Sequence, residues 1–79
     1  MKITKFIELV DHGFELEMRY GGKTYWVTWG RKDEKIFYEA NKTDEIVFHK
    51  AEEILDKEYH GFKIRDMVES LNEDEDVDY

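Results

Sequence analysis

The strongest structural signal in the chain is a strict alternation of apolar and charged residues over residues 14–20, Phe-Glu-Leu-Glu-Met-Arg-Tyr. Successive side chains of a strand point to opposite faces of a sheet, so this pattern predicts a strand with one apolar face and one charged face. The Gly21-Gly22 pair that follows tolerates the positive φ angles of a tight hairpin turn. The chain is therefore expected to reverse direction there.

The segment after the turn, residues 23–29, is rich in Thr, Tyr, Trp and Val, which favour strands. Tyr25, Val27 and Trp29 share one face of this strand, and Trp26 lies on the other. Apolar side chains on both faces predict a central strand, covered at least partly on both sides. The polar residues 30–35 predict a turn, and residues 36–40 predict a third strand. Together these segments predict a three-stranded antiparallel meander.

Apolar spacing predicts three helices around the meander. The apolar residues of the segment 5–11 predict a short first helix that ends at Gly13, with a strand as the alternative. Ala51, Ile54 and Leu55 share one helical face, and the residues 64, 67, 68 and 71 share another after a break at Gly61. Residues 46–48, between the third strand and the second helix, favour a short fourth strand, with the first turn of a helix as the alternative.

These elements predict a single α+β domain over residues 1–71, in keeping with a length of 79 residues. Residues 72–79 contain five acidic residues and little apolar content. Such a segment has too few apolar groups to pack against the domain. We therefore expect residues 72–79 to form an acidic flexible tail.

The net charge of −8 is concentrated in the second half of the chain. Residues 1–42 carry a net charge of +1 and residues 43–79 carry −9. The order helix, three antiparallel strands, helix resembles that of double-stranded RNA-binding domains, which grip phosphates with a Lys-rich start of the last helix. Here that helix begins Lys-Ile-Arg-Asp within the acidic half. Charge therefore argues against nucleic acid and an anionic membrane as partners.

Three segments carry a second resemblance, namely residues 20–25 (Tyr-Gly-Gly-Lys-Thr-Tyr), 51–55 (Ala-Glu-Glu-Ile-Leu) and 61–64 (Gly-Phe-Lys-Ile). With its short first helix, the chain resembles small uncharacterised proteins of Gram-positive bacteria and their mobile elements. The shared motifs are turn glycines, strand aromatics and helix faces. The resemblance therefore implies a fold and no activity.

The sequence holds little that indicates catalysis. It has no cysteine, which removes disulfides and thiolate sites and favours a cytoplasmic protein. Its single serine, Ser70, has no nucleophile elbow around it. The three histidines lie apart in sequence, without metal-ligand spacing. We therefore expect no enzymatic activity, cofactor or metal, and keep a small enzyme or metal-binding protein that uses His49, His60 and Glu53 as an alternative.

The aromatic residues of the predicted strands indicate a different kind of function. Helices of this length can cover little more than one face of a meander, so some of these side chains should stay exposed, unless helices cover both faces. Exposed aromatics are typical of protein interfaces. The sequence thus predicts a protein-interaction or regulatory module that contacts a protein partner or a second copy of itself. The candidate contacts are the sheet edge and the aromatic residues Tyr25, Trp26, Trp29 and Tyr38.

The acidic half allows one further hypothesis. Closely spaced carboxylates can imitate the phosphates of nucleic acid and occupy the binding groove of a basic protein. Glu52, Glu53 and Asp56 are the candidate residues for such an inhibitor of a DNA- or RNA-binding protein.

Overall fold

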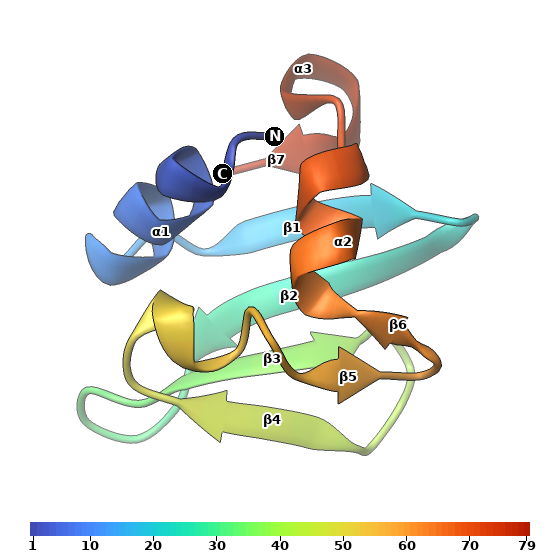
Figure 1. Cartoon of the computed structure of the whole chain (residues 1–79). Coiled ribbons are helices and arrows are strands. Elements are labelled where there is room, and N and C mark those ends of the chain that lie inside the picture. The colour runs from blue at the N-terminus through green and yellow to red at the C-terminus, as the bar shows by residue number, and fades with distance from the viewer.

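The computed structural model describes the whole chain, residues 1–79, as an α+β domain built on one antiparallel sheet (Figure 1). Its five strands lie in the order β4-β3-β2-β1-β7, and every neighbouring pair is antiparallel. The strands are β1 (Leu16–Tyr20), β2 (Lys23–Trp29), β3 (Lys35–Glu39), β4 (Glu45–Phe48) and β7 (Val77–Asp78).

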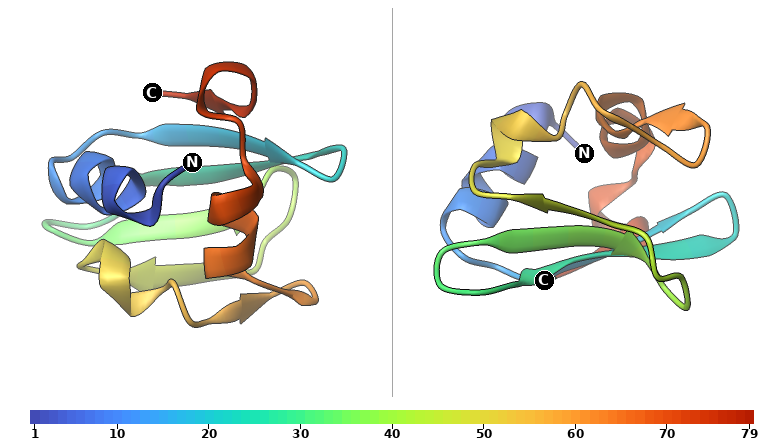
Figure 2. Two further views of the ribbon diagram at one scale, coloured as in Figure 1. Left: turned by 45° about the horizontal axis from the view of Figure 1, so that its top comes forward. Right: turned by 90° about the horizontal axis from the view of Figure 1, so that it is seen from below.

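The remaining elements are three helices, one turn of 3₁₀ helix and a two-stranded hairpin. They are α1 (Ile3–Asp11), η1 (Ala51–Glu53), β5 (Glu58–Tyr59), β6 (Phe62–Lys63), α2 (Ile64–Ser70) and α3 (Glu73–Asp76). The two views of Figure 2 show that α1, η1, the β5-β6 hairpin and α2 all lie on the same side of the sheet. The molecule is therefore a two-layer structure with one covered and one uncovered sheet face.

The core lies between these two layers and consists of eighteen buried apolar residues. Met18, Val27 and Phe37 enter it from the three inner strands, and Phe6 and Met67 enter it from α1 and α2. All five are at most 1% exposed. Because strand side chains alternate, the neighbours of these strand residues must point to the other face.

The meander and its first turn confirm the prediction from the alternating pattern. Gly21 and Gly22 have φ angles of 59° and 78°, and Tyr20 pairs with Lys23 across the turn. The first helix is also confirmed, although it begins two residues earlier than predicted, at Ile3. Residues 45–48 form a strand because Phe48 fills the core at 1% exposure while Val47 points away from it.

The helix α1 ends where Gly13 adopts a φ of 89°. The ring of Trp29 packs directly on this glycine. A Cβ atom added at residue 13 would lie 2.8 Å from Cζ2 of Trp29, well inside van der Waals contact. Gly13 is thus required both for its backbone conformation and for its lack of a side chain.

The prediction that residues 72–79 form a flexible tail is wrong. Residues 73–76 form α3, and the side chain of Asn72 caps this helix by accepting hydrogen bonds from the N–H groups of Asp74 and Glu75. Val77 then pairs with Met18 and is 4% exposed. A single apolar residue seated beside β1, together with a local helix cap, orders a segment whose composition suggested disorder.

The helix predicted around residues 51–55 is only one turn long. The carbonyl oxygens of Leu55 and Lys57 accept hydrogen bonds from the N–H groups of Arg65 and Ile64, respectively. These carbonyl groups therefore bind the first turn of α2 and do not continue a helix of their own. The sheet also differs from the prediction, because it has five strands where the sequence predicted three or four.

Candidate interaction face of the sheet

The face of the sheet opposite the core is not covered by any helix (Figure 2). We call it the outer face, and it consists of strand residues that alternate with those pointing into the core. These residues are Glu17, Arg19, Thr24, Trp26, Thr28, Ile36, Tyr38, Glu45, Val47 and Asp78.

An aromatic pair forms the centre of the outer face. Trp26 on β2 lies directly across from Tyr38 on β3. The same cross-strand row continues to Glu17 on β1 and to Glu45 on β4. Trp26 and Tyr38 are partly buried by their neighbours, and Val47 on the adjacent row is 48% exposed. The row therefore presents two aromatic side chains with a carboxylate at each end.

Arg19 is the only cationic residue of the outer face, and it is already engaged. Its Nη1 lies 2.9 Å from Oδ2 of Asp78 and 3.6 Å from Oε1 of Glu17. Its Nη2 donates to the carbonyl oxygen of Glu75 at 2.9 Å. These contacts fasten β7 and α3 to β1. None of the ion pairs within 4.0 Å involves Glu45, so the carboxylate at the β4 end of the row has no cationic partner.

A groove of about 440 Å³ opens at the β4 end of the outer face. It combines apolar side chains with charged groups of both signs. Its lining residues are Trp29, Gly30, Arg31, Glu34, Ile36, Glu45 and Val47. The outer face thus has a flat aromatic centre and one hollowed end.

The four aromatic residues predicted as contacts lie in three different places. Trp26 and Tyr38 come together at the centre of the outer face. Tyr25 is 3% exposed and stacks on Phe37 in the core, so it offers no surface to a partner. Trp29 stands at the end of β2 and is 49% exposed, with Nζ of Lys35 5.3 Å from its ring centroid.

The acidic residues predicted as contacts lie away from the outer face, on η1 and the turn after it. Oε1 and Oε2 of Glu53 accept hydrogen bonds from the backbone N–H groups of His49 and Lys50, each at 3.1 Å. These bonds, led by that from His49, hold the pKa of Glu53 below its ordinary value. Asp56 accepts from Nε of Arg65 at 3.1 Å. Two of the three carboxylates therefore serve the fold, and Glu52 alone is exposed without a partner.

The structure does not assemble a site from His49 and His60. Nε2 of His49 lies 3.9 Å from Oδ1 of Asp33, whereas His60 bonds to Glu39 and Asp44. No group of three or more His, Asp or Glu side chains is arranged to hold a metal ion.

His60 instead belongs to a hydrogen-bonded cluster with Glu39, Asp44 and Tyr59. Its Nδ1 lies 2.7 Å from Oε1 of Glu39, and its Nε2 lies 2.5 Å from Oδ2 of Asp44. The bonds to Glu39 and Asp44 raise the pKa of His60, and the bond to His60 lowers the pKa of Asp44. The hydroxyl of Tyr59 accepts from the N–H of Glu39 at 2.8 Å and donates to the carbonyl of Asp44 at 2.9 Å.

Sequence reasoning missed this cluster, although the strand pattern contained a signal for it. Phe37 faces the core, so Glu39, two residues later, must face it too. A carboxylate on a core-facing strand position needs a partner. The partner is His60, which sits in the turn of the β5-β6 hairpin with a φ of 48°.

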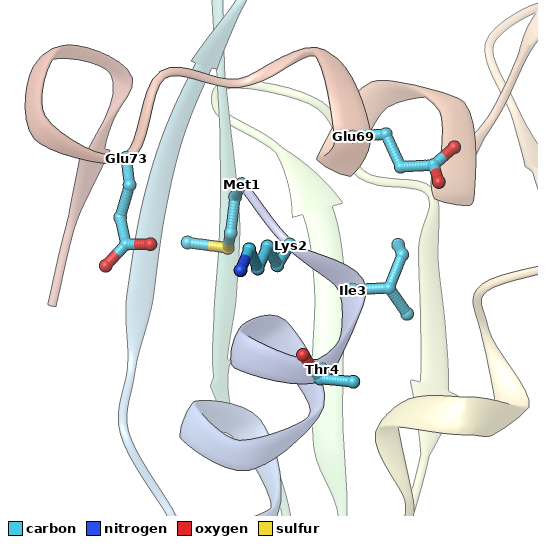
Figure 3. A pocket seen from close by; sticks show the side chains of 6 residues that line it. All are labelled: Met1, Lys2, Ile3, Thr4, Glu69 and Glu73. Atoms are coloured by element: carbon cyan, nitrogen blue, oxygen red, sulfur yellow. The ribbon is translucent and has the colours of Figure 1, made fainter.

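A second groove lies on the opposite layer, between α1, α2 and α3, and has a volume of about 700 Å³ (Figure 3). Glu69 and Glu73 flank Met1 and Lys2 there. The amino group of Met1 donates to the carbonyl oxygen of Leu71. The lining includes no histidine, serine or aromatic residue, and it offers no combination of groups with a recognisable chemistry.

Comparison of the chain with protein-family models, with curated proteins and with solved structures finds no match. None of the helices has the length and apolar character needed to cross a membrane.

Proposed function

We propose that the protein is a non-enzymatic interaction module that binds a protein partner through the outer face of its sheet. The observation that carries this proposal is the position of Trp26 and Tyr38, side by side on a face that no other element covers. Aromatic side chains of this kind are enriched at the centres of protein interfaces.

The neighbouring residues support the same proposal. Ile36 and Val47 extend the apolar area next to Tyr38, and the groove of about 440 Å³ offers a hollow for a protruding side chain. The charged residues Glu17, Arg19, Glu45 and Asp78 surround this area. An apolar centre with a polar rim is the usual anatomy of a protein interface.

Site-specific photo-crosslinking in the cells that produce the protein tests this proposal. Benzoylphenylalanine is placed at Tyr38 on the outer face in one sample and at Glu52, an exposed residue of the helical layer, in the matched control. We expect a discrete adduct from position 38 only, and loss of that adduct when Trp26→Thr is added. The mass of the adduct distinguishes a second copy of this chain from another protein.

Two outcomes would overturn the proposal. Adducts of equal yield from positions 38 and 52 indicate unspecific collisions, and an adduct from position 52 alone places the interface on the helical layer. Thermal unfolding of the Trp26→Thr variant verifies that the loss of an adduct does not reflect unfolding, because Trp26 lies outside the core.

A further inference from the structure

We infer that the outer face recognises an arginine-rich segment of its partner protein, an inference that rests on the proposed function. The structural basis is the row Glu17, Trp26, Tyr38 and Glu45, which runs across four strands. Each ring in this row has a carboxylate beside it on the neighbouring strand. A guanidinium group can then stack on a ring and pair with the adjacent carboxylate at the same time.

The spacing of the row suits two such contacts. Adjacent strands lie about 4.8 Å apart, so the pair Glu17 and Trp26 is separated from the pair Tyr38 and Glu45 by about two strand spacings, on the order of 10 Å. Two arginine side chains that extend from the same side of a partner segment can reach both pairs. Arginine fits this arrangement better than lysine, because its planar group stacks on rings and forms paired hydrogen bonds with a carboxylate.

The negative charge of the outer face argues against two other occupants, single-stranded nucleic acid and a second copy of this chain. Three carboxylates and one arginine give the outer face a net charge of −2, and the whole chain carries −8. Single-stranded nucleic acid stacks on aromatic platforms, but its phosphates need a positive groove. A second copy of this chain brings the same negative face and is repelled as well. The complementary occupant is a basic polypeptide.

Arg19 contacts the Glu17 carboxylate of this row at 3.6 Å, beyond hydrogen-bond distance, and leaves it partly accessible. Its guanidinium group is held by Asp78, Glu17 and the carbonyl of Glu75 at the β7 side of the sheet. The side chain of Glu17 nevertheless remains 31% exposed, and Glu45 is exposed without any cation within 4.0 Å. Both ends of the row are therefore accessible to cations from a partner.

The test uses the full ¹⁵N-labelled chain and three short synthetic peptides with the pattern X-Ser-X-Ser-X, where X is arginine, lysine or citrulline. Citrulline keeps the planar shape of arginine and lacks its charge. We expect NMR shifts in the arginine titration that are confined to the strand residues of the outer face. Affinity should fall about threefold or more with lysine, and more strongly with citrulline. Raising the salt concentration should weaken the arginine complex.

Two variants and one control separate the contributions of the row. The double substitution Glu17→Gln and Glu45→Gln should weaken binding of the arginine peptide by about tenfold. The substitution Trp26→Thr should remove the preference for arginine over lysine. Glu52→Gln, which removes the same charge from the helical layer, should leave binding unchanged.

Equal affinity for the arginine and lysine peptides, or shifts spread over α1 and η1, would overturn the inference, since both indicate unspecific attraction to an acidic protein. Failure of the arginine preference is distinguishable from failure of the proposed interaction module. If position 38 crosslinks to a partner whose contacting segment is not basic, the interaction module stands and the arginine preference is wrong.

Discussion

His60 joins the β5-β6 hairpin to strand β3, because its Nδ1 lies 2.7 Å from Oε1 of Glu39, a carboxylate whose side chain is only 7% exposed. The other ring nitrogen bonds to Asp44 in the loop before β4. One imidazole ring therefore links three segments of the chain, and its charge state should influence their docking.

The pKa shifts set the direction of this influence. The pKa of His60 is raised above 6.5, so the stabilisation that it provides is complete below about pH 6.5 and is lost as the pH rises through the folded-state pKa. The pKa of Asp44 is lowered from 3.8, so its stabilisation is present above that value and is lost in acid. Thermal stability should therefore decline on the alkaline side of pH 6.5.

The substitution His60→Asn isolates this effect. Asparagine accepts the positive φ of the turn, and Asn-Gly is a favoured pair for a two-residue hairpin turn, but the amide does not titrate. We expect the decline in melting temperature above pH 6.5 to be smaller in this variant than in the parent chain. Identical pH profiles for the two proteins would show that the His60 contacts contribute no pH dependence.

Tyr59→Phe should destabilise the protein by about 1–3 kcal/mol, because it leaves the N–H of Glu39 without an acceptor in a buried position. Tyr20→Phe is the matched control, since the hydroxyl of Tyr20 has no hydrogen-bond partner within the protein and the variant should unfold as the parent chain does. Chemical denaturation of both variants provides the comparison. An equal effect of the two substitutions would contradict a structural role for the Tyr59 hydroxyl.

Gly13→Ala should cost more than Gly22→Ala, although both glycines have a positive φ. At Gly22 nothing lies within 4 Å of an added Cβ, so only the backbone penalty of about 1–2 kcal/mol applies. At Gly13 the new methyl group also meets the ring of Trp29, which should add about 1 kcal/mol or more. The difference between their unfolding free energies measures the close approach of the ring, and a difference of zero would mean that the ring moves aside freely.

Val77→Ala tests whether the last residues belong to the folded domain. Val77 is 4% exposed beside β1, and its truncation should cost about 1–2 kcal/mol. Asp74→Ala changes an exposed residue of α3 and should stay within about 0.5 kcal/mol of the parent chain. If both variants were as stable as the parent, β7 would contribute nothing to the domain and the tail predicted from the sequence would be the better description.

These positions also show what can be predicted from sequence. The meander was predictable because its first strand alternates strictly, its second strand is rich in residues that favour strands, and Gly21-Gly22 allows a tight turn between them. The order of residues 72–79 was not predictable, because their acidic composition outweighs one apolar residue. The position that Val77 occupies exists only once β1 is in place. The length of a short helix is equally hard to predict. The segment after η1 does not continue as a helix because its carbonyl groups bond to the N–H groups of Ile64 and Arg65, which are distant in sequence.

The candidate site also has one part that was predictable from the sequence and one part that was not. Period-2 alternation already placed Trp26 on the face opposite Tyr25, and this assignment is confirmed. Which of the two faces would stay uncovered depended on the docking of all the helices on one side, and no local pattern specifies that choice. The partnership of His60 with Glu39 likewise depends on a hairpin that folds back over β3.

The position of β1 between β2 and β7 has a consequence for how the protein folds. On one side β1 pairs with β2 through a two-residue turn. On the other side it pairs with β7, which lies 59 residues further along the chain. Short-range pairings form quickly, whereas closing a long loop carries an entropic penalty that grows with its length. We expect the β1–β4 meander to be formed in the rate-limiting transition state and β7 to add last. Substitutions at Val77 should then accelerate unfolding and leave the folding rate almost unchanged.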